Sequence, residues 1–116
     1  MPDDADELSR LEQFRQIVEM DPGDYFSHFG LGTVLFEEGH YQEAVKEFRE
    51  TVRLKPDYSA AIRDLGKALE KIGAHDEAMQ VYGEGIPVAE RNGDLQTAKE
   101  MHVFLRRLER GQEAAG

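Results

Sequence analysis

Apolar residues along this chain follow helical spacing, and one stretch of the pattern is copied at an interval of 34 residues. The two copies agree in the kind of residue as well as in its position. An interval of this length is typical of a helical hairpin that stacks on its own copies. The sequence therefore predicts two consecutive hairpins from these matched positions: Pro22 and Pro56, Leu31 and Leu65, Gly32 and Gly66, Leu35 and Leu69, Gly39 and Gly73, Glu43 and Glu77, Ala44 and Ala78, Phe48 and Tyr82.

The small residues of the pattern have a physical reason. Gly32 and Gly66 fall in the middle of predicted helices, where a glycine costs about 1 kcal/mol relative to alanine. The cost is explained if a neighbouring helix passes too close to leave room for a side chain. Ala44 and Ala78 would be the small residues on that neighbouring helix. We therefore expect the two helices of each hairpin to meet backbone to backbone at these positions.

The ends of the helices also carry signals. Gly39 and Gly73 are expected to end the first helix of each hairpin in a left-handed conformation, which glycine adopts without strain. Asp24 and either Asp57 or Ser59 are the predicted N-caps of the first helices, because their side-chain oxygens can accept from the free N–H groups of the first turn.

These motifs resemble the tetratricopeptide repeat family, in which small and large apolar residues recur at the same interval. The first copy reads His28-x-x-Leu31-Gly32-x-x-Leu35, then Ala44-x-x-x-Phe48, then Pro56, and the second reads Ile62-x-x-Leu65-Gly66-x-x-Leu69, then Ala78-x-x-x-Tyr82. The chain departs from the family at His28 and Ile62, where an aromatic residue is usual, and at Leu35 and Leu69, where tyrosine is usual. The resemblance implies an all-α fold, an α-α superhelix of antiparallel helical hairpins with about six helices.

One domain, residues 1–116, accounts for the whole chain. Its expected parts are an N-terminal packing helix (1–22), a first repeat (24–56), a second repeat (58–92), a C-terminal capping helix (94–110) and a frayed tail (111–116). The second helix of the second repeat is expected to be long, with a kink or break at residues 85–87, because Pro87 lies inside it. Gly93, Asp94 and Ala98 give the capping helix the appearance of the turn and second helix of a further repeat.

Charge and composition narrow the classes of partner. The net charge is −10, from 24 acidic and 14 basic residues, and such a field repels nucleic acid and anionic membrane surfaces. We read the acidic surplus as solubility, with adaptation to high salt as the alternative. The acidic first residues do not resemble a secretory signal, and no apolar run is long enough to span a membrane, so a cytoplasmic protein is expected.

Residues that could carry chemistry are few and scattered. The chain has no cysteine, its four histidines lack the spacing of metal ligands, and no serine stands in a nucleophile motif. No glycine loop that could cradle a phosphate is present. The sequence therefore predicts no enzyme, no cofactor and no metal site.

A binding surface follows from the resemblance, because the first helices of this family line the concave face of the superhelix. By position, the first hairpin would offer Phe26, Phe29, Thr33, Phe36 and Glu37, and the second would offer Ala60, Arg63, Asp64, Lys67, Glu70 and Lys71. Three basic residues in this set recur every four positions and so share one helical face. An apolar peptide with a carboxylate would fit such a groove.

Two alternatives to this groove remain open. The basic side chains could be solvated and paired with Asp64 and Glu70, and Phe26 and Phe29 could pack beneath the N-terminal helix. The family's carboxylate clamp is not expected, because Phe29, Thr33 and Asp64 replace its polar residues.

The sequence thus predicts a scaffold that binds a partner protein or peptide of unknown identity. The alternative is a self-associating module, a homodimer or stacked assembly formed through the terminal helices. Val103 and Phe104 lie off the apolar stripe of the last helix and would be exposed for that contact.

Overall fold

The computed structural model describes residues 8–115, and this part of the chain consists of six helices joined by short turns, without a strand. The expected all-α class is therefore confirmed. Residues 1–7, which belong to the expected N-terminal packing helix, and residue 116 lie outside the described residues. The helices are α1 (Arg10–Met20), α2 (Tyr25–Glu37), α3 (Tyr41–Leu54), α4 (Ser59–Lys71), α5 (His75–Arg91) and α6 (Leu95–Ala115).

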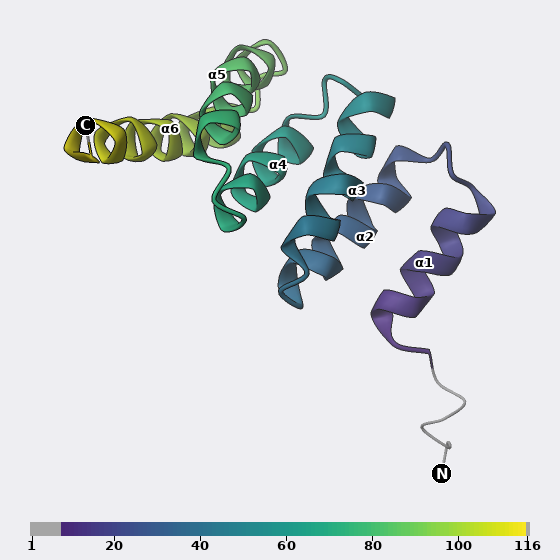
Figure 1. Cartoon of the computed structure of the whole chain (residues 1–116). Helices are drawn as coiled ribbons and strands as arrows, with labels where there is room; N and C mark the ends of the chain where they lie inside the picture. Colours follow the sequence, from purple (N-terminus) through teal and green to yellow (C-terminus); the bar gives the residue numbers. More distant parts are fainter. Residues whose placement is uncertain (1–7, 116) are drawn as a thin grey trace.

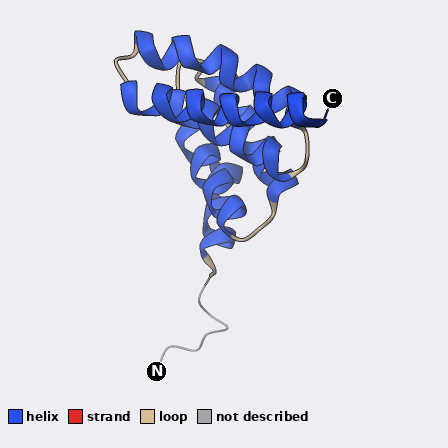
Figure 2. Cartoon of the chain, turned by 90° about the vertical axis from the view of Figure 1, so that its left-hand side faces the viewer, coloured by secondary structure: helices blue, strands red, loops and turns tan. Residues whose placement is uncertain are grey.

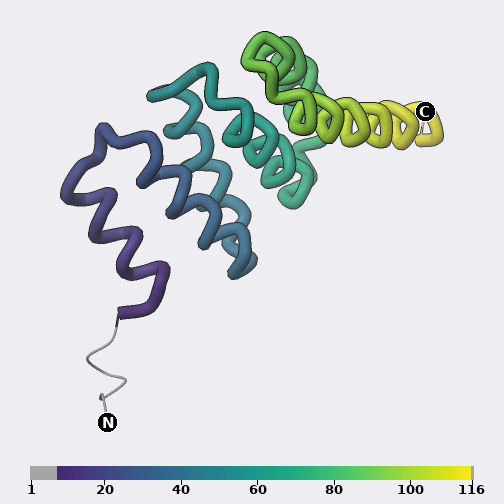
Figure 3. The backbone as a smooth tube through the Cα atoms, turned by 180° about the vertical axis from the view of Figure 1, so that it is seen from behind, coloured from purple at the N-terminus to yellow at the C-terminus, as the bar shows by residue number. Residues whose placement is uncertain are grey.

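The helices follow one another in a curved row, with α1 at one end and α6 at the other (Figure 1). Seen from the side and from behind, successive helices run antiparallel (Figures 2 and 3). The two predicted hairpins are α2 with α3 and α4 with α5. No helix in the described region is long and apolar enough to cross a lipid bilayer.

Three turns share one geometry. Gly39, Gly73 and Gly93 have φ values of +84°, +79° and +73°, and each is followed by a residue whose N–H donates to a carbonyl five residues earlier. This confirms the caps expected at Gly39 and Gly73. The same geometry at Gly93 shows that α5 and α6 are joined as the two helices of a hairpin are.

Helix starts follow the predictions only in part. Asp24 caps α2, because its Oδ1 accepts from the N–H of Phe26 at 3.1 Å, as expected. The expected cap of α4 by Asp57 or Ser59 is wrong, since Tyr58 is the N-cap and makes no side-chain cap bond. Ser59 already lies within the helix, and its hydroxyl donates to Asp94 at 2.7 Å.

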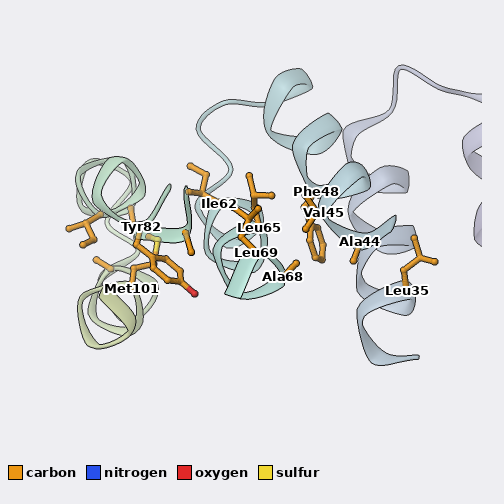
Figure 4. Close-up of a cluster of buried hydrophobic side chains, with 14 of the residues drawn as sticks. Leu35, Ala44, Val45, Phe48, Ile62, Leu65, Ala68, Leu69, Tyr82 and Met101 are labelled. Atoms are coloured by element: carbon orange, nitrogen blue, oxygen red, sulfur yellow. The ribbon is translucent and has the colours of Figure 1, made fainter. Parts of the chain in front are cut away.

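The core depends on aromatic rings that lie against glycines. A Cβ on Gly32 would lie 2.7 Å from the ring of Phe48, and one on Gly66 would overlap the ring of Tyr82. Both rings are buried in the row of core side chains in Figure 4. The expected lack of room for a side chain at both glycines is therefore confirmed, but a ring fills the space, and not the backbone of the neighbouring helix as expected.

Two further glycines play the same part, and the sequence analysis did not identify them. A Cβ on Gly30 would overlap the ring of Phe14, which holds α1 against α2. A Cβ on Gly85 would lie 2.5 Å from Ile62 and 2.8 Å from Met101. Gly85 therefore lets α5 fit between α4 and α6.

A pair of ion bridges repeats with the helices. Arg15 on α1 reaches Glu43 on α3 at 2.9 Å, and Arg49 on α3 reaches Glu77 on α5 at 2.5 Å. Both members of the second pair follow those of the first by 34 residues. All four side chains are exposed, so each bridge contributes at most about 1 kcal/mol. The bridges tie alternate helices together on the side of the row formed by α1, α3 and α5.

The second half of the chain is more continuous than expected. Helix α5 includes Pro87 without a break. Gly83, whose carbonyl would otherwise bond to residue 87, is exposed like Pro87 itself, so water can reach the freed carbonyl. Residues 111–115, which were expected to fray, continue α6 as far as Ala115. The side chain of Gln112 donates to Asp76 at 2.5 Å and attaches this end of α6 to the start of α5.

The buried side chain of His28 contacts two polar groups outside α2, one on Glu47 of α3 and one on Pro22, which precedes α2. Its Nδ1 lies 2.8 Å from an oxygen of Glu47, and its Nε2 lies 2.8 Å from the carbonyl oxygen of Pro22. Both partners are acceptors, so an imidazolium that donates from both nitrogens satisfies both. Burial lowers the pKa of His28, but the hydrogen bonds to Glu47 and Pro22, with the negative charges of Glu47 and Glu50, outweigh burial and raise it above 6.5.

The ring-on-glycine contact gives the first prediction. Gly66→Ala should destabilise the fold by about 1–3 kcal/mol, because the buried ring of Tyr82 cannot move aside without strain. Gly83→Ala is the matched control, since Gly83 is helical and exposed and nothing lies near its added Cβ. It should stabilise the fold by about 0.5–1 kcal/mol. Urea unfolding followed by circular dichroism measures both, and equal effects would contradict the packing argument.

His28 gives a prediction about pH. A group whose pKa is raised by folding stabilises the fold at pH values below its unfolded pKa of about 6.5, and this contribution is lost as the pH rises through the folded pKa. Between about pH 6 and pH 9, the urea midpoint should therefore fall more steeply for the natural chain than for His28→Gln. His40→Gln, which changes an exposed histidine, is the control. Parallel curves for the natural chain and His28→Gln would refute the role of the imidazolium.

Candidate functional site

A hollow of about 320 Å³ lies between α2 and α4, with part of its floor formed by α3. Six of the residues that the sequence analysis placed on the concave face lie together here: Thr33, Phe36, Glu37, Arg63, Asp64 and Lys67. Phe48 completes the lining. We call this space the first hollow.

A second hollow, of about 400 Å³, continues from the first toward α6. Phe36 and Lys67 line both hollows, so the two form one groove along α2, α4 and α6. The second hollow includes Glu70 and Lys71, which were also expected on that face, together with Phe104 and Arg107. Eight of the eleven residues expected on the concave face therefore line the groove.

Phe26 and Phe29 line neither hollow. The ring of Phe29 lies 5.9 Å from that of Phe48 and 5.0 Å from that of Tyr58, between centroids, so it belongs to the packing between the two hairpins. Phe26 is 62% exposed. Neither the predicted groove position nor packing beneath the N-terminal helix describes Phe29, because its ring partners lie on the side away from α1.

Arg63 is a structural cation. Its Nε lies 2.9 Å from Asp64, and its terminal nitrogen lies 3.5 Å from Glu100 on α6. Burial lowers the pKa of Arg63, but the hydrogen bond and negative charge of Asp64, and the charge of Glu100, raise it overall. The guanidinium therefore stays charged, and its charge is matched within the groove wall.

Glu70 plays the corresponding part for Arg107. It accepts a hydrogen bond of 2.5 Å from the hydroxyl of Tyr82 and lies 2.9 Å from the guanidinium of Arg107. Burial, foremost, and the neighbouring Glu70 carboxylate raise the pKa of Tyr82, so its hydroxyl remains a donor. The open alternative therefore holds for Arg63, which pairs with Asp64, but not for Glu70, which pairs with Arg107 and not with the lysines.

Lys67 and Lys71 differ from the two arginines. The ammonium of Lys67 lies 5.6 Å from the centroid of the Phe36 ring, and that of Lys71 lies 5.6 Å from the centroid of the Tyr41 ring. Within residues 8–115, no carboxylate lies within 4 Å of either ammonium. The groove therefore presents two positive charges that the described chain does not pair.

Sequence reasoning missed the contribution of α6. Phe104, which was expected to be exposed for self-association, is half-buried, and its ring lies 5.5 Å from that of Tyr82. Val103, its neighbour, is 57% exposed. The available signal was charge complementarity between α4 and α6, where Arg63 faces Glu100 and Glu70 faces Arg107 at the same interval of 37 residues.

Other chemistry finds little support in the described residues. They contain no cluster of three or more histidine or acidic side chains placed to hold a metal ion. The arrangement of the groove suits non-covalent binding, with aromatic walls and a positive rim.

Comparison with known proteins finds the same repeat. A family model described as tetratricopeptide repeat matches residues 35–101. A TPR repeat-containing protein of Pseudomonas aeruginosa is 38% identical over 84 residues, which cover 72% of this chain and 80% of that protein. Longer relatives also match, and the chain spans 9% to 19% of their length.

Solved structures agree in fold. A protein of Bordetella parapertussis is 30% identical, with a TM-score of 0.78, and the match covers 90% of this chain and 91% of that one. The TPR2B domain of yeast Sti1, solved in complex with pHsp70, has a TM-score of 0.81 at 11% identity, and the match covers 87% of this chain and 81% of the domain. At that identity the likeness to Sti1 shows the fold alone.

Proposed function

The chain belongs to the tetratricopeptide repeat family, and we propose that it holds a segment of a partner protein in the groove formed by α2, α4 and α6. Domains of this family mediate protein–protein interaction. That the groove is the binding face in this chain is our proposal.

One observation carries the proposal, namely that two adjoining hollows share Phe36 and Lys67 as lining residues. Together they offer adjoining spaces for side chains of one extended segment, which is how many domains bind peptides. Aromatic surface supplies the apolar part of such a contact, and the lysines supply a polar anchor. The complex of the yeast Sti1 domain with pHsp70 supports the idea by analogy of fold only.

Obstruction of the first hollow tests the proposal. Thr33→Trp should fill the space between α2 and α4 and reduce capture of the partner by about tenfold or more. Gln42→Trp on α3 is the matched control, because Gln42 is exposed and lines neither hollow of the groove. The measurement is affinity capture from a source-cell lysate with quantitative mass spectrometry.

The informative proteins are those that bind the natural chain and Gln42→Trp but not Thr33→Trp. Circular dichroism and the thermal midpoint establish that each variant is folded, and Lys67→Glu serves as the second groove variant if Thr33→Trp is not. Partners that bind all variants equally would exclude the groove as the contact.

A second candidate function is self-association through the N-terminal end. Large apolar side chains are exposed around the α1–α2 turn, with Ile17 at 45%, Met20 at 85% and Phe26 at 62%. A dimer formed there should dissociate when Met20→Glu places a charge in the contact, whereas Glu19→Gln, on the same exposed turn of α1, should leave it intact. Light scattering over a concentration series measures this, and a natural chain that stays monomeric throughout would eliminate the candidate.

A further inference from the structure

We propose that the segment bound in the groove is acidic, and that it carries carboxylates two residues apart beside one bulky apolar residue. The carboxylates would bind Lys67 and Lys71, and the apolar side chain would enter the first hollow. This inference rests on the function proposed above and specifies the chemistry of the partner.

Among the basic side chains of the groove, the two lysines are the ones available to an incoming carboxylate. Of the four basic residues that line it, Arg63 is paired with Asp64 and Glu100, and Arg107 is paired with Glu70. An incoming carboxylate would have to compete with these existing partners. Lys67 and Lys71 contact rings instead, and a ring leaves the ammonium charge intact and open on its other sides.

The spacing of the lysines sets the spacing of the carboxylates. Lys67 and Lys71 lie one turn apart on the same face of α4, which places their Cβ atoms about 5–6 Å apart. In an extended segment, side chains two residues apart point to the same side at a separation of about 6.5 Å. Acidic residues at alternate positions therefore match the two lysines better than adjacent ones, which point to opposite sides.

The rings beneath the lysines reduce the entropic cost of binding. A free lysine side chain loses rotamer entropy when it is fixed. Here Phe36 and Tyr41 already contact the ammonium groups in the unbound chain. The lysines are therefore partly positioned before the partner arrives.

The acidic surface of the chain does not oppose this arrangement at close range. The net charge is −10, but charges more than about 8–10 Å away are largely screened at physiological ionic strength. Within the groove, the carboxylates of Glu37, Asp64 and Glu70 are each paired with an arginine, so the two lysines are the nearest charges that the described chain leaves for a bound carboxylate. A basic segment would be repelled at this point of the groove.

The first hollow supplies the apolar part of the site. Phe36 and Phe48 line it, and Phe36 also lies beneath Lys67. An apolar side chain in this hollow would therefore lie next to the carboxylate bound by Lys67. In the partner segment, the bulky apolar residue is therefore expected to lie next to the acidic residues in sequence.

Nuclear magnetic resonance titration of the full chain tests the inference with synthetic probes. The first probe is a short capped peptide with one phenylalanine followed by aspartates at alternate positions, and the second has asparagines in place of the aspartates. The aspartate peptide should bind about three- to tenfold more tightly and shift the amide signals of α2 and α4. In Lys67→Gln/Lys71→Gln, the two peptides should bind equally.

The control variant is Lys46→Gln/Lys99→Gln, which removes the same charge from exposed lysines that line neither hollow of the groove. It should keep the preference for the aspartate peptide. Equal binding of both peptides by the natural chain would overturn the inference and leave the groove itself in place. Failure of the aspartate peptide to bind at millimolar concentration would also overturn it, whereas the proposed function stands or falls on the Thr33→Trp capture experiment.

Discussion

The seating of an aromatic ring on a glycine is the contact on which the architecture depends. Phe48 lies against Gly32, Tyr82 against Gly66 and Phe14 against Gly30, and each ring fills the volume that a Cβ would occupy. Because cores are close-packed, such a contact fixes the distance between two helices within narrow limits. These contacts set the distance of α2 from α3 and of α4 from α5, and α3, which packs against both α2 and α4, positions the two helices that flank the first hollow. The groove is a consequence of how the core is packed.

Tyr82 joins the core to the groove. Its ring is fully buried against Gly66, while its hydroxyl donates to Glu70, which in turn holds Arg107 of α6. This chain of contacts neutralises one cation of the groove from within. Arg63 is neutralised in the same way by Asp64 and Glu100. The two lysines thus stand out because the packing of the helices has already used the other charges.

Most of the fold could be predicted from the repeat interval, because Gly32, Gly39 and their copies are required by constraints that are local or that recur at a fixed distance along the chain. What the sequence could not supply were contacts between helices that break the repeat. Ser59 has a partner in Asp94 in place of a capping role, and the pairing of Arg63 with Glu100 depends on where α6 lies. Eight of the eleven residues expected on the concave face line the groove, because helix position determines the face, whereas Phe29 turns into the packing between hairpins.

The two exposed ion bridges, one between α1 and α3 and one between α3 and α5, have a consequence for how repeats can be added to the chain. Arg49 repeats the role of Arg15, and Glu77 that of Glu43, so the joint between one unit and the next is the same at both places. Since each unit contacts only its neighbours, tandem duplication of residues 24–57 would repeat this bridge, with Arg49 of the first copy facing Glu43 of the second. The product would have a longer groove between the same N-terminal and C-terminal helices. Evolution or a protein engineer could in this way change the length of the recognised segment without redesigning either end.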